Sequence, residues 1–219
     1  SFAMAQPYLE TVATDQARPQ VSEVVMVLLE DQRGLVWLGT QQGLVRYDGY
    51  RFRRFRHNPT DATSLADDFV SALARDASGR IWVGTQSGLN RLEPNGRGFA
   101  RYLHDGGDPA SLAHDWVYAL HRGVSGRLWI GTVGGGIDRW DSAAGKFEHF
   151  PLAQLLNGAR GFDDVFALHE AADGRVWAGT REGLVVLDPA QRTAKRVDLA
   201  NDTGTQPLIT TMHADRYGR

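Results

Sequence analysis

Apolar and polar residues alternate in short stretches along the chain, and turns rich in glycine and aspartate separate these stretches. Residues 69–74 alternate, residues 80–85 are mostly β-branched or aromatic, and two further apolar stretches follow at 89–92 and 99–103. Alternation with a period of two places side chains on opposite faces of a strand, and β-branched and aromatic residues favour strands. This pattern predicts four short antiparallel strands joined by tight turns.

The same pattern occurs four times at a nearly constant spacing. The segment GRIWVGTQSGL, which begins at Gly79, has the counterparts GLVWLGTQQGL, GRLWIGTVGGGI and GRVWAGTREGL. Their tryptophans are Trp37, Trp82, Trp129 and Trp177, which lie 45, 47 and 48 residues apart. Four-stranded repeats at this period predict an all-β fold, a β-propeller built of four-stranded antiparallel blades. We expect four complete repeats plus the first strand of a fifth, and interpret the chain as a fragment of a larger propeller.

The repeats divide the chain into blades. We expect blade 1 at residues 21–56, blade 2 at 69–103, blade 3 at 116–150, blade 4 at 164–199 and the start of blade 5 at 208–219. Residues 1–4 are interpreted as a vector scar and residues 5–20 as an N-terminal segment with a candidate ring-closing strand. A helix of about one turn is expected at residues 152–156.

Composition narrows the classes of function. The chain is 42% hydrophobic and carries a formal net charge of −2, with its basic residues scattered, so we expect no nucleic-acid partner. It has no cysteine, which excludes disulfides and thiolate metal sites, and no apolar run long enough to cross a membrane. We expect no cofactor, and find no nucleophile, phosphate-loop or zinc-protease motif that would indicate catalysis.

The repeated text resembles a known family. Residues 70–91, which read VSALARDASGRIWVGTQSGLNR, resemble the two-component regulator propeller repeat. The resemblance implies a periplasmic sensor region, with further blades and a membrane-linked output domain, either a histidine kinase or a diguanylate cyclase, elsewhere in the intact protein. Blades 3 and 4 depart from the pattern, because Gly123 and Ala171 stand where blade 2 has its turn aspartate Asp76.

The four repeated tryptophans could be read as a carbohydrate platform. One tryptophan per blade at one strand position is instead typical of packing, because a buried aromatic ring contributes a large apolar area between blades. We therefore assign Trp37, Trp82, Trp129 and Trp177 to the structural core of the repeats.

Variable residues are better candidates for a binding site. In propellers the first strand lines the central channel, so its start and the connection between strands two and three share one end of the channel, here called the mouth. Polar and aromatic groups that converge there suit a small-molecule site. The candidate residues are Trp116, Phe69, Asp68, Asp115, Asp163, Asp164, Gln42, Gln86, Arg181 and Glu182. The alternatives are that Asp68, Asp115 and Asp163 cap backbone amides at strand starts, and that Arg181 and Glu182 form a solvated turn pair, which we favour for that pair.

Histidines form a second set. His121, His169 and His213 hold one position in three consecutive blades, at the opposite end of the channel from the aspartates. A metal site is a weak alternative, because each blade supplies one histidine and neighbouring blades are expected to hold them apart. A polar channel lining with pH-sensitive charge is the favoured interpretation.

Together with the absence of a catalytic motif, the resemblance implies a non-enzymatic, periplasmic sensor module. We expect it to bind a small molecule, such as an oligosaccharide, or a protein partner at the mouth and to relay that event to a membrane-linked output. The alternatives are a propeller lyase or hydrolase with a histidine-bound divalent metal, and a protein-interaction scaffold that forms a homodimer through its blades.

Overall fold

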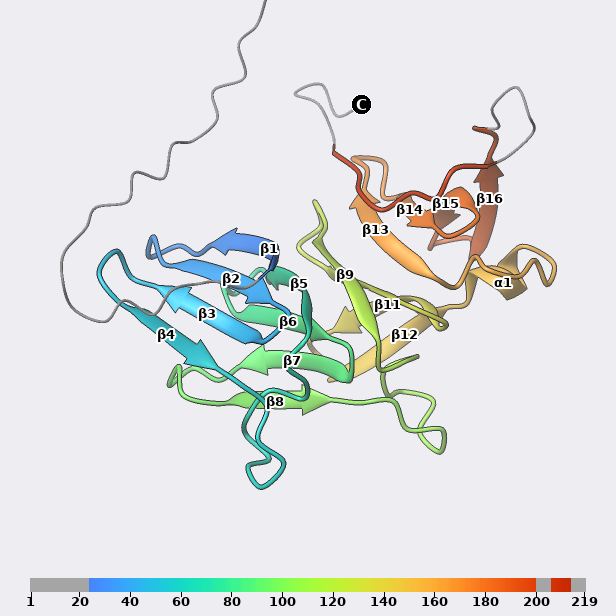
Figure 1. The fold of residues 1–219 in the computed structure, drawn as a ribbon. Helices are drawn as coiled ribbons and strands as arrows, with labels where there is room; N and C mark the ends of the chain where they lie inside the picture. Colours follow the sequence, from blue (N-terminus) through green and yellow to red (C-terminus); the bar gives the residue numbers. More distant parts are fainter. Residues whose placement is uncertain (1–23, 200–205, 214–219) are drawn as a thin grey trace, which may run out of the picture.

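The computed structural model describes residues 24–199 and 206–213, which form four separate four-stranded antiparallel sheets (Figure 1). Blade 1 contains β1 (Val25–Glu30), β2 (Val36–Thr40), β3 (Gly43–Tyr47) and β4 (Phe52–Phe55). Blade 2 contains β5 (Val70–Arg75), β6 (Ile81–Thr85), β7 (Gly88–Leu92) and β8 (Phe99–Tyr102). Blade 3 contains β9 (Val117–Arg122), β10 (Leu128–Thr132), β11 (Gly136–Asp141) and β12 (Lys146–Phe150). Blade 4 contains β13 (Val165–Glu170), β14 (Val176–Thr180), β15 (Gly183–Asp188) and β16 (Thr193–Val197).

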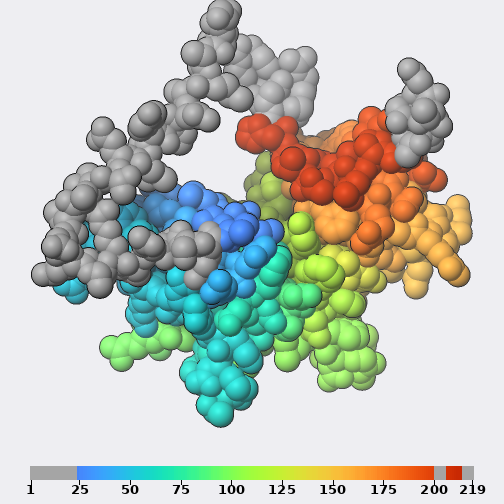
Figure 2. Space-filling model, viewed as in Figure 1, coloured from blue at the N-terminus to red at the C-terminus, as the bar shows by residue number. Residues whose placement is uncertain are grey.

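Each blade pairs its strands in sequence order, which confirms the predicted all-β propeller blades. The first strands form the inner row: β1 packs on β5, β5 on β9, and β9 on β13. No comparable packing joins β13 back to β1 within the described residues, so the four blades form an open arc in Figure 1. Figure 2 shows the same succession of blades, from blue to red, as a space-filling surface.

The repeated tryptophans lie at the seams between blades. Trp37, Trp82 and Trp129 expose no more than 2% of their surface, as predicted for the core. Trp82 packs on Trp140 of the following blade, with ring centroids 5.4 Å apart. Trp177 is only half-buried, so the prediction of a fully buried ring was wrong there, because the described residues place no complete blade over it.

The arc exposes an apolar face at blade 1. Leu28 on β1 is 62% exposed, whereas its counterpart Leu73 on β5, which faces blade 1, is 7% exposed. Val25 is likewise 43% exposed, although its counterpart Val70 is fully buried. The open face of β1 therefore has the composition of an inter-blade seam.

The far end of the arc differs from the prediction. Residues 208–213 were expected to form a first strand, but no strand is assigned to the described residues 206–213. Ile209 nevertheless occupies the position that valines hold at the other seams: it packs on Gly179, and its N–H donates to the Thr180 carbonyl at 3.1 Å. The expected strand within residues 5–20 lies outside the described residues.

A single helical turn follows blade 3. Helix α1 (Leu152–Leu155) lies where one turn was expected and buries Leu152 against blade 4. None of the helical segments in the described ranges is long and apolar enough to span a bilayer.

Candidate functional site

The start of a first strand lies beside the connection between the second and third strands of the same blade. The Phe69 carbonyl accepts the N–H of Gln86 at 3.2 Å, and the Trp116 carbonyl accepts the N–H of Val133 at 2.9 Å. These bonds bring the start of each first strand to the connection between the second and third strands of its own blade. The predicted residues at these two places therefore share one end of the arc.

The three predicted aspartates at the mouth are engaged with backbone amides. Asp68 accepts the N–H of His57 at 2.6 Å, and Asp115 accepts that of His104 at 2.7 Å. Asp163 accepts the N–H of Ala153 at 3.0 Å. Burial raises the pKa of Asp163, and hydrogen bonds from Ala153 and a neighbouring amide oppose that rise. The capping alternative describes these contacts, although the capped amides belong to the segments after the preceding blades and not to strand starts.

The other predicted mouth residues vary in exposure. Phe69, Trp116 and Asp164 are half-buried. Asp164 bonds Arg181 at 2.5 Å, so Arg181 pairs with this aspartate and not with the adjacent turn residue. Gln42, Gln86, Arg181 and Glu182 are exposed. Binding of a ligand at the mouth remains a prediction.

Two of the three predicted histidines lie side by side. The rings of His121 and His169 are half-buried with centroids 5.3 Å apart, so the expectation that adjacent blades hold them apart was wrong. Burial lowers the pKa of His121, nearby His169 lowers it further, and Glu170 opposes the change. His213 is exposed, and the described part of the chain contains no group of three side chains suited to a metal ion.

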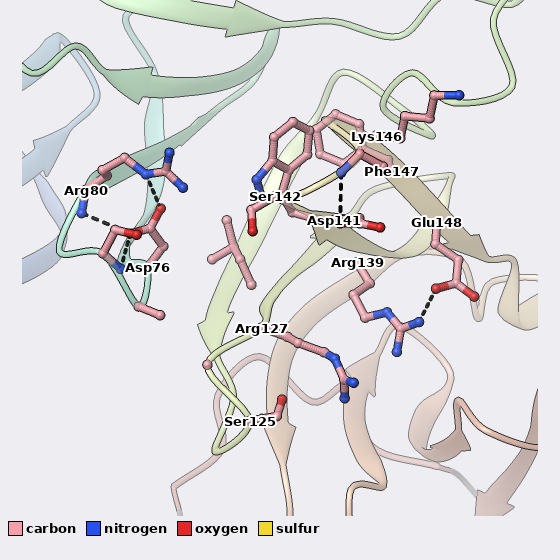
Figure 3. Close-up of a pocket in the computed structure, with 16 residues that line it drawn as sticks. Asp76, Arg80, Ser125, Arg127, Arg139, Asp141, Ser142, Lys146, Phe147 and Glu148 are labelled. Atoms are coloured by element: carbon pink, nitrogen blue, oxygen red, sulfur yellow. Dashed lines mark hydrogen bonds and ion pairs between the residues drawn. The ribbon is translucent and has the colours of Figure 1, made fainter.

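A cavity of about 640 Å³ lies between blades 2 and 3, at the end of the strands opposite to the mouth. Its walls come from the β5–β6 turn, the β9–β10 turn, and the hairpin of β11 and β12 (Figure 3). None of the residues predicted for a binding site lines it. The lining residues that carry charge are Asp76, Arg80, Arg127, Arg139, Asp141, Lys146 and Glu148.

The β5–β6 turn contributes a fixed ion pair. Asp76 accepts hydrogen bonds from the Arg80 guanidinium at 2.6 Å and from the Trp82 indole at 3.0 Å. Burial acts to raise the pKa of Asp76, but the bonds from Trp82 and Arg80 outweigh it and hold the pKa below its ordinary value. This carboxylate is therefore charged, and its side-chain partners both belong to its own blade.

The hairpin of blade 3 holds the other two carboxylates. Glu148 bonds Arg139 across the strand pair and Arg192 of blade 4 at 2.9 Å. Asp141 accepts the N–H groups of Ala144 and Ala143, and these bonds lower its pKa. All three acidic groups of the cavity are thus already bonded.

One wall of the cavity is aromatic. Trp140 and Phe147 line it with ring centroids 4.8 Å apart, and Tyr102 packs behind them, 5.0 Å from Trp140. Trp140 is 8% exposed. The site therefore combines charged groups with an apolar surface, which is the composition of small-molecule sites.

Comparison with known proteins identifies the repeat. Residues 64–87, which span the start of blade 2 and its first two strands, match the family model described as two component regulator propeller. Blade 2 therefore contains a match to the two-component regulator propeller repeat.

Over most of its length the chain also resembles solved structures in fold. The chain is 27% identical to the solved extracellular domain assigned to a hybrid two component system of B. thetaiotaomicron, with a TM-score of 0.72 over 81% of this chain and 25% of that one. It is 40% identical over 42 residues to Histidine kinase P4 of Formosa agariphila, covering 19% of this chain and 3% of that protein. Virginiamycin B lyase of Staphylococcus aureus shares the fold alone, at 14% identity and a TM-score of 0.60 over 86% of this chain and 60% of that one. The chain therefore spans no more than a quarter of the length of either of the first two of these proteins.

The propeller repeats of this chain differ at the turn between their first two strands. Asp31 and Asp76 each accept the indole N–H of their blade's tryptophan at 3.0 Å. In blade 3 that position is Gly123, and the buried indole nitrogen of Trp129 has no hydrogen-bond partner. The departure that the sequence shows at Gly123 therefore changes the bonding of the turn that lines the cavity.

Sequence reasoning missed the cavity residues, although two signals pointed to them. Trp140 is one of six tryptophans and, like Trp116, stands outside the repeated position. Gly123 removes the aspartate beside Arg127, which lines the cavity. Deviations from the repeat in blade 3 therefore mark this site.

Proposed function

We propose that the chain is part of the extracytoplasmic, periplasmic sensor region of a bacterial two-component receptor, where it binds a small molecule without transforming it. One observation carries this proposal: the propeller repeats occur in a chain that resembles the extracellular domain of a hybrid two component system over 81% of its length. The likeness to a lyase, at lower identity, is one of fold and supports no reaction.

The cavity between blades 2 and 3 is the proposed ligand site. Its volume of about 640 Å³ falls within the usual range for small-molecule sites. Its walls come from two blades, so a ligand there would contact both and could change their relative position. At the mouth, by contrast, the carboxylates of Asp68, Asp115 and Asp163 already bond the backbone.

The proposed sensor is completed by further blades and a membrane-linked output domain. The exposed face of β1, which includes Val25 and Leu28, has the composition of a seam and would be covered by another blade of the same ring. A second copy of the chain is less suited to cover this face. To close a ring, β1 of one copy would have to pack on Gly179 of the other, and Ile209 already fills that position.

The role can be tested in cells that carry the full-length protein and a reporter of its output. A small molecule that stabilises the purified chain should change the reporter when it is added outside the cell. Protease added after removal of the outer membrane should digest the propeller repeats while cytoplasmic proteins survive. A compound that binds the chain but is converted to product, or an output that no bound compound alters, would contradict the sensor role.

A further inference from the structure

Arg127 differs from its counterparts in neighbouring blades. Arg80 and Arg175 hold the same place in blades 2 and 4, and their guanidinium groups bond Asp76 and Asp173, each at 2.6 Å. The Arg127 side chain makes no hydrogen bond or ion pair in the described part of the chain. It lines the cavity between blades 2 and 3 and is exposed.

The missing partner follows from a substitution in the turn. Blade 3 has Gly123 where blade 2 has an aspartate, and the carboxylate of Glu170 from blade 4 fills the space that a side chain at position 123 would need. Glu170 is 1% exposed and accepts the Ser125 hydroxyl at 3.0 and 3.1 Å. An acidic group thus lies beneath this turn but does not pair with Arg127.

The acidic groups that line the cavity are all bonded, whereas two of its basic groups, Arg127 and Lys146, form no ion pair among the described residues. Asp76, Asp141 and Glu148 are bonded to arginines or backbone amides, as described above. Lys146 forms no ion pair among the residues that the structure describes. In Figure 3 the Arg127 and Arg139 side chains extend toward the same side of the cavity, whereas the Lys146 side chain points away from them.

We propose that this cavity binds an anionic small molecule through Arg127. A planar guanidinium presents two parallel N–H donors to a carboxylate or sulfate, and such charge-assisted pairs are among the stronger hydrogen bonds. Trp140 and Phe147 form the apolar wall against which the body of the ligand packs. Lys146, which also lines the cavity, adds a longer-range attraction for the anion, and dissolved salt weakens that attraction. This inference deepens the proposed sensor role by naming the class of ligand.

The test is a binding experiment on the 219-residue chain. Titration calorimetry uses matched sets of small molecules: uronate disaccharides, sulfated disaccharides, their neutral hexose counterparts, and mono- and dicarboxylates. At least one anionic member should bind with a Kd below about 1 mM at low salt, and its neutral counterpart should bind at least roughly tenfold more weakly. The carboxylate and sulfate sets show which oxyanion the site prefers.

Matched variants localise the site. Arg127→Ala should weaken binding roughly 10- to 100-fold, Arg127→Lys should weaken it less, and Arg175→Ala, which alters the same position in blade 4, should leave it unchanged. The proposal is overturned if no anion binds with a Kd below about 1 mM, if neutral counterparts bind equally, or if Arg127→Ala binds like the unaltered chain.

A second variant keeps Arg127 but gives it a partner. Gly123→Asp combined with Glu170→Ala clears the space and places an aspartate where blade 2 has one, so Arg127 becomes paired and anion affinity should fall by roughly tenfold or more. Glu170→Ala alone is the control and should retain binding. Unchanged affinity in a folded double variant overturns the proposal. Because these assays need no output domain, binding without a cellular response would contradict the sensor role and leave the site intact.

Discussion

The side chain of Val117 on β9 lies against the backbone of Gly84 on β6, so closely that a Cβ at position 84 would be 2.7 Å from its Cγ1. The same relationship joins each described pair of consecutive blades, and Val70, Val165 and Ile209 pack on the equivalent glycines. The glycine in each repeated Trp-x-Gly-Thr segment is therefore explained by the approach of the next blade and not by a ligand.

Substitution Gly84→Ala should destabilise the chain by about 1–3 kcal/mol, because the added methyl overlaps Val117 and lies in tight contact with Ala72. Combining it with Val117→Ala should recover part of the loss. Gly106→Ala is a control, because a Cβ there meets nothing closer than 4.0 Å, and it should change stability by less than about 0.5 kcal/mol. Urea unfolding measures all three. Equal effects of the changes at positions 84 and 106 would contradict the seam assignment.

Leu28 and Leu73 hold equivalent positions with opposite exposure, 62% and 7%. Leu73→Ala should therefore cost about 2–5 kcal/mol, and Leu28→Ala in this chain less than about 0.5 kcal/mol. In a longer chain that contains the covering blade, Leu28→Ala should become costly as well. If Leu28→Ala has the same small effect in the longer chain, no blade covers β1.

His149 should hold its ring proton to a higher pH than an ordinary imidazole does, because its pKa is raised. Its Nδ1 lies 2.7 Å from the buried carboxyl group of Asp138 and its Nε2 lies 2.8 Å from the Pro109 carbonyl, an arrangement that suits an imidazolium with hydrogen on both ring nitrogens. Burial raises the pKa of Asp138, and the bond from His149 opposes that rise. The bond to Asp138 raises the pKa of His149 above 6.5, although burial opposes the rise. Its contribution to stability is therefore complete below pH 6.5 and is lost as the pH rises through the higher pKa of the folded state.

Asp138→Asn tests this pair, because Asn90 already fills the equivalent site in blade 2 and bonds the N–H of Ala66 at 2.8 Å, as Asp138 bonds that of Ala113. The variant should keep the amide bond, lower the pKa of His149 in NMR titration, and flatten the fall of unfolding free energy above pH 6.5. An unchanged titration of His149 would show that Asp138 does not hold the proton.

Asp76 should dominate acid sensitivity in blade 2. Its pKa lies below 3.8 in the folded chain, since the Trp82 and Arg80 bonds outweigh the effect of burial, so its contribution is present above pH 3.8 and is lost as the pH falls through the lower folded value. Asp76→Asn should reduce stability at pH 7 and weaken its dependence on acid, as followed by tryptophan fluorescence. Asp173→Asn, at an exposed turn of blade 4, should change both far less.

The fold could be predicted because the same pattern of strands and turns occurs four times in the sequence. The tryptophan, the glycine and the turn recur at the same place in each repeat, and this recurrence sufficed to predict the strand order and the period of the blades. The first strand expected for blade 5 was not found in the described residues 206–213, although Ile209 takes the seam position there. A strand also needs a hydrogen-bonded partner on its own blade.

The site was harder to predict because it depends on differences between repeats. The sequence favoured the mouth because Trp116 and the aspartates are predicted to cluster there. In the structure, however, the carboxylates of these aspartates accept hydrogen bonds from backbone amides ten or eleven residues away in sequence. Arg127 lacks a partner in the cavity because blade 3 has Gly123 in place of the turn aspartate and Glu170 approaches that glycine from another blade. Such a contact between residues 47 positions apart leaves no local pattern.

The most direct test of the account is the output of the full-length protein when an anionic ligand that binds the cavity is added outside the cell. Receptors with Arg175→Ala should respond at the same concentration as the unaltered receptor, whereas Arg127→Ala should need at least about tenfold more ligand at equal protein abundance. An Arg127→Ala receptor that responds at the unaltered concentration would contradict the claim that the propeller repeats sense a ligand between blades 2 and 3.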